Sequence, residues 1–318
     1  MTELPSRVQI NEEGPREGFQ IESSDIATER KLELIDALAR TGLRQIQVVS
    51  LVNPKKVPGM ADADEVVRRI ERRPGVRYTA LWFNDRGLER ALELDKLDIK
   101  GSLPMCASDV FLKRNQNRTQ EENVEALRKT IQTYKSHGIA VTRGSVMAAF
   151  GCNFEGVIPI EKVVSLVGQI HDLAEEYELD INELALADTM AWATPESVKR
   201  VVGAVREKFP GFRINLHLHD TRGMGIANAY AGLQMGIDSF DASVAGLGGC
   251  PFARHRGAAG NVCTEDLAFM CEEMGIETGI DVEALLSAAH LAEEIVGHQL
   301  PGSVKLGGTL SAFRRHAA

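Results

Sequence analysis

Eight apolar, often β-branched runs alternate with amphipathic stretches of helical period, and this order constrains the fold more than any other feature. The runs expected as strands are 8–11, 45–52, 78–83, 97–103, 139–150, 180–186, 213–218 and 239–245. The stretches expected as helices include 29–41, 62–73, 123–138, 160–178, 195–209 and 264–275. Eight strand–helix units without a linker predict an α/β fold, a (β/α)8 TIM barrel.

We expect residues 1–280 to form the barrel as the catalytic domain. Residues 281–318 are expected to form a short C-terminal helical extension, a helix over 282–296 and a tail, that packs on the barrel. The rival is a doubly wound open sheet. It usually has five or six strands and often a glycine-rich first turn, whereas residues 14–18 (GPREG) lack the phosphate fingerprint of that turn.

The composition excludes several classes of protein. The net charge is −9 with acids and bases mixed along the chain, which is unlike the basic stripe of a nucleic-acid binder. No apolar run approaches the roughly 18 residues of a membrane span, and the polar N-terminus does not resemble a signal peptide. The five cysteines are odd in number and lack CxxC spacing, which indicates a reducing compartment. We therefore expect a soluble cytoplasmic protein with no nucleic-acid or membrane partner.

The active sites of such barrels lie at the carboxyl ends of the strands, and the motif HLHD (217–220) ends the seventh. Histidines at i and i+2 of a strand project from the same face, so His217 and His219 suit a divalent metal. The alternative is a hydrogen-bonded polar core. The carboxylate of Glu17 and the amide of Asn261, at neighbouring strand ends, favour the metal. Two imidazoles, one carboxylate and one amide oxygen fit Mg²⁺ or Mn²⁺, while Zn²⁺ and Co²⁺ stay open.

A glycine-rich loop, AGLGGCPFARHRGAAGN (245–261), follows the eighth strand. Cys250 lies in it without a core to enter, so we expect a lid thiol that acts as a general acid or base. For Cys106 and Cys271 a small buried side chain is the simpler interpretation. Arg254 adds positive charge to the same loop with its two neighbours, and a solvated surface turn is the alternative for them.

The loop after the second strand, NPKKVPGM (53–60), carries two adjacent lysines between two prolines. Lys55 and Lys56 are candidates to receive the phosphates of a ligand. The alternative is a stiff connection with exposed charges.

The residues then resemble a known family, the hydroxymethylglutaryl-CoA lyases. SVAGLGGCPFA (243–253) is similar to the family's cysteine loop, and NPKKVPGMAD (53–62) to its loop after strand two. GPREGFQ resembles GPRDGLQ, HLHDTRG resembles HxHDTxG, and LADTMAWATP (186–195) resembles DTxGxGTP. The likeness extends from about Gln9 to about Val296. The cysteine loop is specific to the family, while the Arg-acid and HxH pairs also occur in isopropylmalate and homocitrate synthases.

The resemblance implies a metal-dependent lyase that cleaves a 3-hydroxy-3-methylglutaryl thioester into acetyl-CoA and acetoacetate, with CoA as part of the substrate. It implies the metal ligands Glu17, His217, His219 and Asn261. Arg16 would polarise the thioester carbonyl, Cys250 would transfer a proton as the lid closes, and Asp188 would assist near the hydroxyl. The family also suggests a homodimer.

Four departures distinguish this chain from the family pattern. Glu17 stands where the family has an aspartate ligand, and Gln47 where it has an acid on strand two. Ala191 and Ala193 replace glycines around Trp192, and the cysteine loop is two residues longer at 254–256. Together they suggest a paralogue for a different 3-hydroxy-acyl-CoA, such as citramalyl-CoA. A condensing acyl-CoA synthase of the isopropylmalate synthase type and a non-catalytic acyl-CoA binder are the rival functions.

Overall fold

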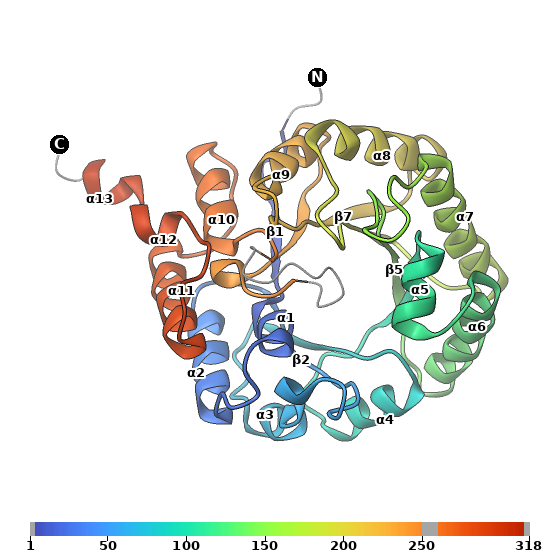
Figure 1. The fold of residues 1–318 in the computed structure, drawn as a ribbon, viewed down its shortest axis with the longest axis horizontal. Helices are drawn as coiled ribbons and strands as arrows, with labels where there is room; N and C mark the ends of the chain where they lie inside the picture. The colour runs from blue at the N-terminus through green and yellow to red at the C-terminus, as the bar shows by residue number, and fades with distance from the viewer. Residues whose placement is uncertain (1–3, 250–259, 315–318) are drawn as a thin grey trace. The chain divides into compact units, whose positions relative to one another are not determined.

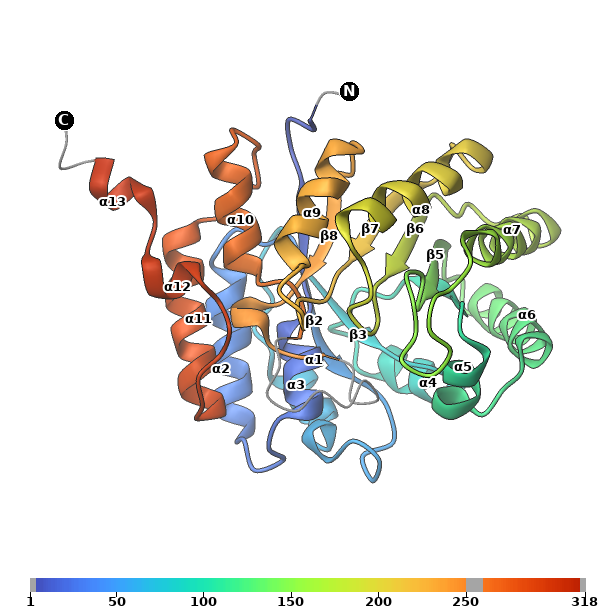
Figure 2. The same cartoon turned by 45° about the horizontal axis from the view of Figure 1, so that its top comes forward.

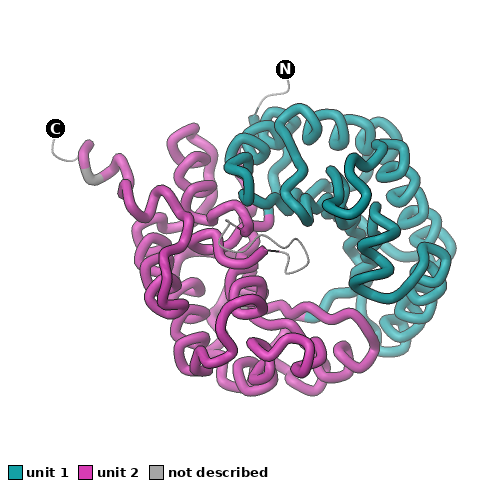
Figure 3. The backbone as a smooth tube through the Cα atoms, viewed as in Figure 1, with its two compact units in different colours: residues 1–5, 99–240, 252–254 teal, residues 6–98, 241–251, 255–318 magenta. Residues whose placement is uncertain are grey.

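The structure is a computed structural model that describes residues 4–249 and 260–314. The described chain divides into two compact units (Figure 3). Unit 1 holds residues 4–5 and 99–240, and unit 2 holds residues 6–98, 241–249 and 260–314. The division into a barrel over 1–280 and an extension over 281–318 stays a prediction.

Unit 1 is built from repeated strand–helix pairs (Figure 1). Its strands are β4 (Gly101–Cys106), β5 (Val141–Met147), β6 (Glu183–Ala187) and β7 (Arg213–His217). Its helices are α5 (Asp109–Gln116), α6 (Gln120–Ser136), α7 (Ile160–Glu176), α8 (Pro195–Lys208) and α9 (Gly225–Gln234). The strands pair in parallel in chain order. Helix α6 packs on β4, α7 packs on β4 and β5, and α8 packs between α7 and α9.

Unit 2 contains the first three strands and the C-terminal end of the described chain. Its strands are β1 (Gln9–Glu12), β2 (Gln45–Ser50) and β3 (Arg77–Leu81). Its helices are α1 (Gly14–Ile21), α2 (Thr28–Ala39), α3 (Ala63–Arg69), α4 (Asp85–Glu93), α10 (Thr264–Glu273), α11 (Val282–Val296), α12 (Val304–Gly307) and α13 (Leu310–Arg314), with the 3-10 turns η1 (Pro58–Met60) and η2 (Val244–Gly246). Helix α11 packs between α2 and α10, and the three run side by side in Figures 1 and 2.

The strands confirm the predicted fold class. β8 (Ser239–Ala242) contributes residues to both units, and the described strands form one sheet in the order β3-β2-β1-β8-β7-β6-β5-β4. This is the cyclic neighbour order of a (β/α)8 barrel. Within the described part of the chain, no helix is both long enough and apolar enough to cross a bilayer.

Two elements differ from the sequence-based expectation. Residues 14–21, which follow the first expected strand and were not expected as a helix, form helix α1, because Pro15 is favourable in the first turn, where its missing N–H is not needed. The fourth strand begins at Gly101 and not at Leu97. The segment before it is held by Asp98, whose N–H donates to the Tyr78 carbonyl oxygen and whose carboxylate accepts from the Tyr78 N–H.

Two buried acids in unit 2 hold the turn after β8. Glu12 accepts hydrogen bonds from the N–H groups of Gly14 and Val244 and from the Thr264 hydroxyl, at 2.7, 2.9 and 2.6 Å. Glu265 accepts from the Ala245 N–H at 2.9 Å. Burial raises the pKa of Glu12 to about 7 and that of Glu265 to about 8, although these hydrogen bonds act in the opposite direction. The turn they hold leads directly into the predicted cysteine loop.

We predict that Glu265→Gln stabilises the protein increasingly as the pH rises. The pKa of Glu265 is raised from 4.5 to about 8, so the folded chain keeps a proton that the unfolded chain has lost. The stability from this proton is fully present below pH 4.5 and is lost as the pH approaches 8. Glutamine is neutral throughout, so the melting temperature of the variant relative to the wild type should rise over this window.

Thermal denaturation followed by circular dichroism measures this difference in melting temperature. The same substitution at the exposed Glu71 should give a constant offset, and a constant offset at Glu265 would contradict the prediction.

Candidate functional site

Helix α1 places Arg16 and Glu17 at the carboxyl end of β1. Glu13 is the N-cap residue, and its carbonyl oxygen accepts from the N–H groups of Arg16 and Glu17 at 3.1 and 2.8 Å. The Glu13 N–H donates to the carbonyl oxygen of Ala242 at 2.8 Å, which ties the helix start to β8. Backbone hydrogen bonds alone therefore fix the first turn of α1.

The guanidinium of Arg16 is surrounded by acceptors. Its Nη2 pairs with Glu13 Oε2 at 2.5 Å and its Nη1 with Glu17 Oε1 at 2.7 Å. Its Nε donates to the side-chain oxygen of Gln47 on β2. Burial alone would lower the pKa of Arg16, but the two carboxylates reverse this and raise the pKa. Arg16 is thus a fixed, permanently charged donor.

Glu17 orients Asn261. The Nδ2 of Asn261 donates to Glu17 Oε2 at 2.6 Å and to the Leu247 carbonyl oxygen at 3.2 Å. Its Oδ1 is buried and has no hydrogen-bond partner within residues 4–249 and 260–314. Gly248, at φ +93°, allows the backbone after η2 to pass close to Glu17, since a Cβ at this position would lie 2.5 Å from the Cβ of Glu17. Unit 2 therefore presents one carboxylate and one unused amide oxygen.

The two histidines of unit 1 face each other. His217 ends β7 and His219 follows two residues later. Their Nε2 atoms lie 3.3 Å apart, and the rings meet edge to face with centroids 5.1 Å apart. His219 is buried and His217 is half-buried. The two nitrogens are within hydrogen-bond distance of each other, and the same placement suits a shared cation, because imidazole nitrogens are common metal ligands.

Asp188 follows β6 in the same unit. Its Oδ1 accepts from the N–H groups of Trp192 and Ala193 at 2.7 and 3.0 Å, while its Oδ2 is buried without a hydrogen-bond partner among the described residues. Burial raises the pKa of Asp188, and the nearby His219 and His217 act against that rise. One oxygen is held by the backbone and the other is available for a ligand.

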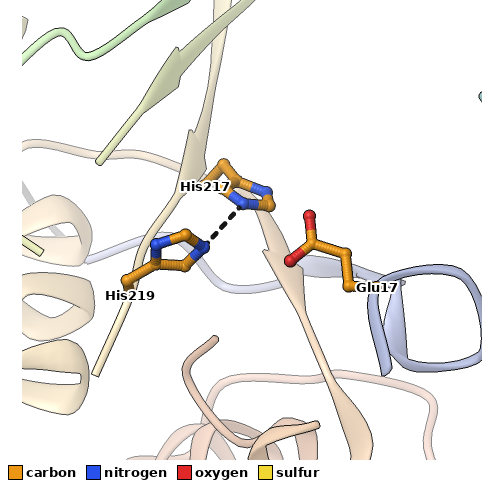
Figure 4. Close-up of side chains that lie close together, drawn as sticks. All are labelled: Glu17, His217 and His219. Atoms are coloured by element: carbon orange, nitrogen blue, oxygen red, sulfur yellow. Dashed lines mark hydrogen bonds between the residues drawn. The ribbon is translucent and has the colours of Figure 1, made fainter. Parts of the chain in front are cut away.

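Three of the predicted metal ligands come together. Figure 4 shows Glu17, His217 and His219, whose ligand atoms all lie within 4.8 Å of one another. The donor set is one carboxylate and two imidazoles, which is suitable for a divalent transition metal such as Mn²⁺. The unused Asn261 Oδ1 beside Glu17 is a further oxygen of the kind that hard cations prefer. The residues present therefore fit a divalent cation.

The remaining predicted residues have different outcomes. Lys55 and Lys56 are exposed on the loop after β2. Cys250 and Arg254 lie outside the described residues. Cys106 and Cys271 are buried, and burial raises the pKa of each thiol to about 12, which agrees with the interpretation that they are inert core side chains.

Sequence reasoning missed one residue at Arg16, namely Glu13. The signal that would have revealed it is the spacing, because Glu13 and Arg16 are an i,i+3 pair once residues 14–21 are seen to be a helix.

Known proteins resemble the chain over almost its whole length. It matches the HMGL-like family model over residues 7–292. It is 42% identical over 297 residues to the hydroxymethylglutaryl-CoA lyase YngG of Bacillus subtilis strain 168, covering 93% of this chain and 96% of that protein. The crystal structure of a Bacillus subtilis HMG-CoA lyase superposes with a TM-score of 0.88 at 40% identity, covering 96% of this chain and 99% of that one. An HMG-CoA lyase of Acinetobacter baumannii, in complex with coenzyme A and 3-methylmalate, has a TM-score of 0.85 at 35% identity, covering 97% of both chains.

Proposed function

The chain belongs to the HMGL-like family and is a carbon–carbon lyase, and from this premise we propose that it cleaves a 3-hydroxy-acyl-CoA, hydroxymethylglutaryl-CoA or a close analogue. The products are acetyl-CoA or another acyl-CoA and an oxo acid. The observation that carries the proposal is the cluster of Glu17, His217 and His219. It supplies a cation site of the kind that an enolate-forming cleavage requires.

In this proposal Glu17, His217, His219 and Asn261 hold a divalent cation, Mg²⁺ or Mn²⁺. The supporting observations are the ligand cluster and the unused oxygen of Asn261. When bound, such a cation acts as a Lewis acid that lowers the pKa of the substrate hydroxyl and fixes its position. Glu17 also keeps Asn261 oriented through the 2.6 Å hydrogen bond.

The residues of the chain perform the remaining steps. Asp188 Oδ2 accepts the proton of the 3-hydroxyl, and the C2–C3 bond breaks with its electron pair going to the thioester enolate. Arg16 stabilises the charge on the enolate oxygen, because a fixed guanidinium favours that charge more than the neutral carbonyl. Cys250 delivers the proton that converts the enolate carbon to the acyl-CoA product, and C3 leaves as the carbonyl of the oxo acid.

The phosphates of the CoA portion are assigned to three basic residues. Lys55, Lys56 and Arg254 bind them in this proposal, and the exposure of both lysines supports it. The CoA complex of the Acinetobacter baumannii relative supports CoA as a ligand class.

A second candidate substrate is citramalyl-CoA or another thioester with a different branch. The segment around Trp192 supports it, because Ala191 and Ala193 stand where the family pattern has glycines, with the bulky Trp192 between them. The indole Nε1 donates to Asn153 Oδ1 at 2.7 Å, and the ring contacts Gly151 so closely that a Cβ there would lie 2.6 Å from it. The loops after β5 and β6 are therefore joined through this side chain.

A panel of 3-hydroxy-acyl-CoA thioesters, with product identification and with or without chelator, tests the proposal. We expect metal-dependent release of an acyl-CoA and an oxo acid. Preferential, efficient turnover of hydroxymethylglutaryl-CoA would exclude the divergent substrate. Thiol release from acetyl-CoA with 2-oxo acids would favour the condensing synthase. Absence of turnover together with absence of a divalent ion at saturating Mn²⁺ would favour the non-catalytic binder.

Cys250→Ser is expected to lower the turnover rate while metal binding is unchanged. Serine is a far weaker proton donor than a thiol, and general acid catalysis contributes roughly 10²–10⁴-fold to a rate. Steady-state kinetics and Mn²⁺ titration measure the two quantities separately. The buried Cys271 provides the matched variant, since Cys271→Ser should affect stability and leave the rate constant per folded enzyme unchanged. Full activity of Cys250→Ser would remove the proton-transfer role.

We further propose that the protein acts in the cytoplasm as a homodimer. The bacterial relative and the five cysteines without CxxC spacing, which indicate a reducing compartment, support the cytoplasmic location. The family resemblance supports the homodimer. Size-exclusion chromatography with light scattering tests the oligomeric state.

A further inference from the structure

Arg16 has a different set of partners from the one that the family pattern implies. The family has an acid on strand two, and here that position is Gln47, which offers Arg16 Nε a neutral amide oxygen. A buried guanidinium needs negative charge nearby. The structure provides it from two carboxylates: that of Glu17, whose Oε1 lies 2.7 Å from Arg16 Nη1, and that of Glu13, whose Oε2 lies 2.5 Å from Arg16 Nη2.

The surroundings of Glu13 keep its carboxylate in contact with Arg16. Its side chain is 3% exposed, and its backbone is fixed on both sides by the bonds to Ala242 and to the first turn of α1. An i,i+3 pair on a helix has little freedom to separate. The carboxylate is therefore rigidly placed beside Arg16 and is shielded from water, where a charge-assisted hydrogen bond is strongest.

We propose that Glu13 is a positioning residue for catalysis, which orients and charge-balances Arg16 at a site where Gln47 offers only a neutral oxygen. The contacts with Gln47, Glu17 and Glu13 use three of the five N–H groups of Arg16. They set the plane of the guanidinium and so the direction of the two other N–H groups, toward the thioester oxygen. Arg16 is thus flanked by two carboxylates, Glu13 and Glu17, and by the neutral amide of Gln47. This inference rests on the proposed function for its catalytic consequence.

The test is a charge-exchange cycle with four proteins: the wild type, Glu13→Gln, Gln47→Glu and the double variant. Glu13→Gln keeps the shape and removes the charge, so kcat should fall roughly ten- to hundredfold, as for loss of a hydrogen bond to a charged group, with KM little changed. The double variant restores one acid beside Arg16 and should recover most of kcat. Glu176→Gln, which removes a surface partner of Arg128, is the matched control and should leave kcat unchanged.

Gln47→Glu alone separates the two interpretations of the site. If Glu13 and Glu17 already balance Arg16, a third acid over-neutralises the guanidinium and kcat falls. If the site simply lacks an acid, Gln47→Glu supplies it and kcat rises, which overturns the proposal. This variant keeps the inference testable even where Glu13→Gln fails to fold.

A readout without turnover makes the result independent of the substrate. In ¹⁵N NMR of the arginine side chains, the Arg16 guanidinium N–H groups should give slowly exchanging signals in the wild type. These should be lost in Glu13→Gln and regained in the double variant. Unchanged signals in Glu13→Gln would refute the positioning role. If the signals follow the proposal while the wild type cleaves no thioester, the proposed function fails and the placement of the charge stands.

Discussion

Replacing His217 with alanine is expected to abolish metal-dependent cleavage. His217 is one of three residues whose ligand atoms lie within 4.8 Å of one another, and its Nε2 is 3.3 Å from that of His219. Removing it leaves a gap in the ligand set that water fills. A metal ion supplies several kcal/mol of transition-state stabilisation, and losing that amount lowers the rate roughly a thousandfold or more.

The measurement pairs turnover with metal binding. Mn²⁺ affinity, followed by electron paramagnetic resonance, should weaken together with the rate, while the melting temperature of the metal-free protein should change little because His217 is only half-buried. His137→Ala, at an exposed histidine that ends α6, is the matched control and should bind Mn²⁺ and turn over normally. A His217→Ala protein with wild-type Mn²⁺ affinity would show that His217 is not a ligand.

The alternation of apolar runs was sufficient to predict the fold class, because burial on both faces of a parallel strand leaves a continuous apolar segment. The predicted boundaries of the strands and helices were less accurate where a proline or glycine weakens the local sequence pattern. Pro104 interrupts the apolar run of β4, and the glycines at 14 and 18 disguise α1. Propensity alone argues against both elements, and tertiary packing of α1 on β2 and η1 outweighs it.

The candidate site could be predicted only in part, for a related reason. His217 and His219 are two residues apart on one strand, so their common face follows from strand geometry. The Glu13–Arg16 pair depends on α1 being a helix, and the hydrogen bond from Asn261 to Glu17 joins residues 244 positions apart. Nothing local in the sequence encodes such a contact. Asn261 was predicted from its place near a strand end and from the resemblance to a family, and only the structure revealed Glu13.

Replacing Arg16 with lysine is expected to lower kcat roughly 10²–10³-fold, although the charge is kept. Loss of a single positioned donor in an oxyanion site has about this effect. Arg16 contacts Glu13, Glu17 and Gln47 through three different nitrogens. An ammonium is a single point charge that cannot reach all three and still donate to a thioester oxygen.

The same substitution at Arg213 is the matched control. That side chain is exposed at the start of β7, with its Nε 2.9 Å from Asp238 Oδ1, so Arg213→Lys should leave kcat unchanged. Comparing kcat with KM separates the roles of Arg16, because an interaction made mainly in the transition state affects kcat, whereas one made equally in the bound substrate affects KM. A rise in KM at constant kcat would reassign Arg16 to substrate binding. A normal kcat and KM would mean that a positive charge at this position is sufficient for catalysis. The contacts of Arg16 with Glu13, Glu17 and Gln47 would then stabilise the fold and not the transition state.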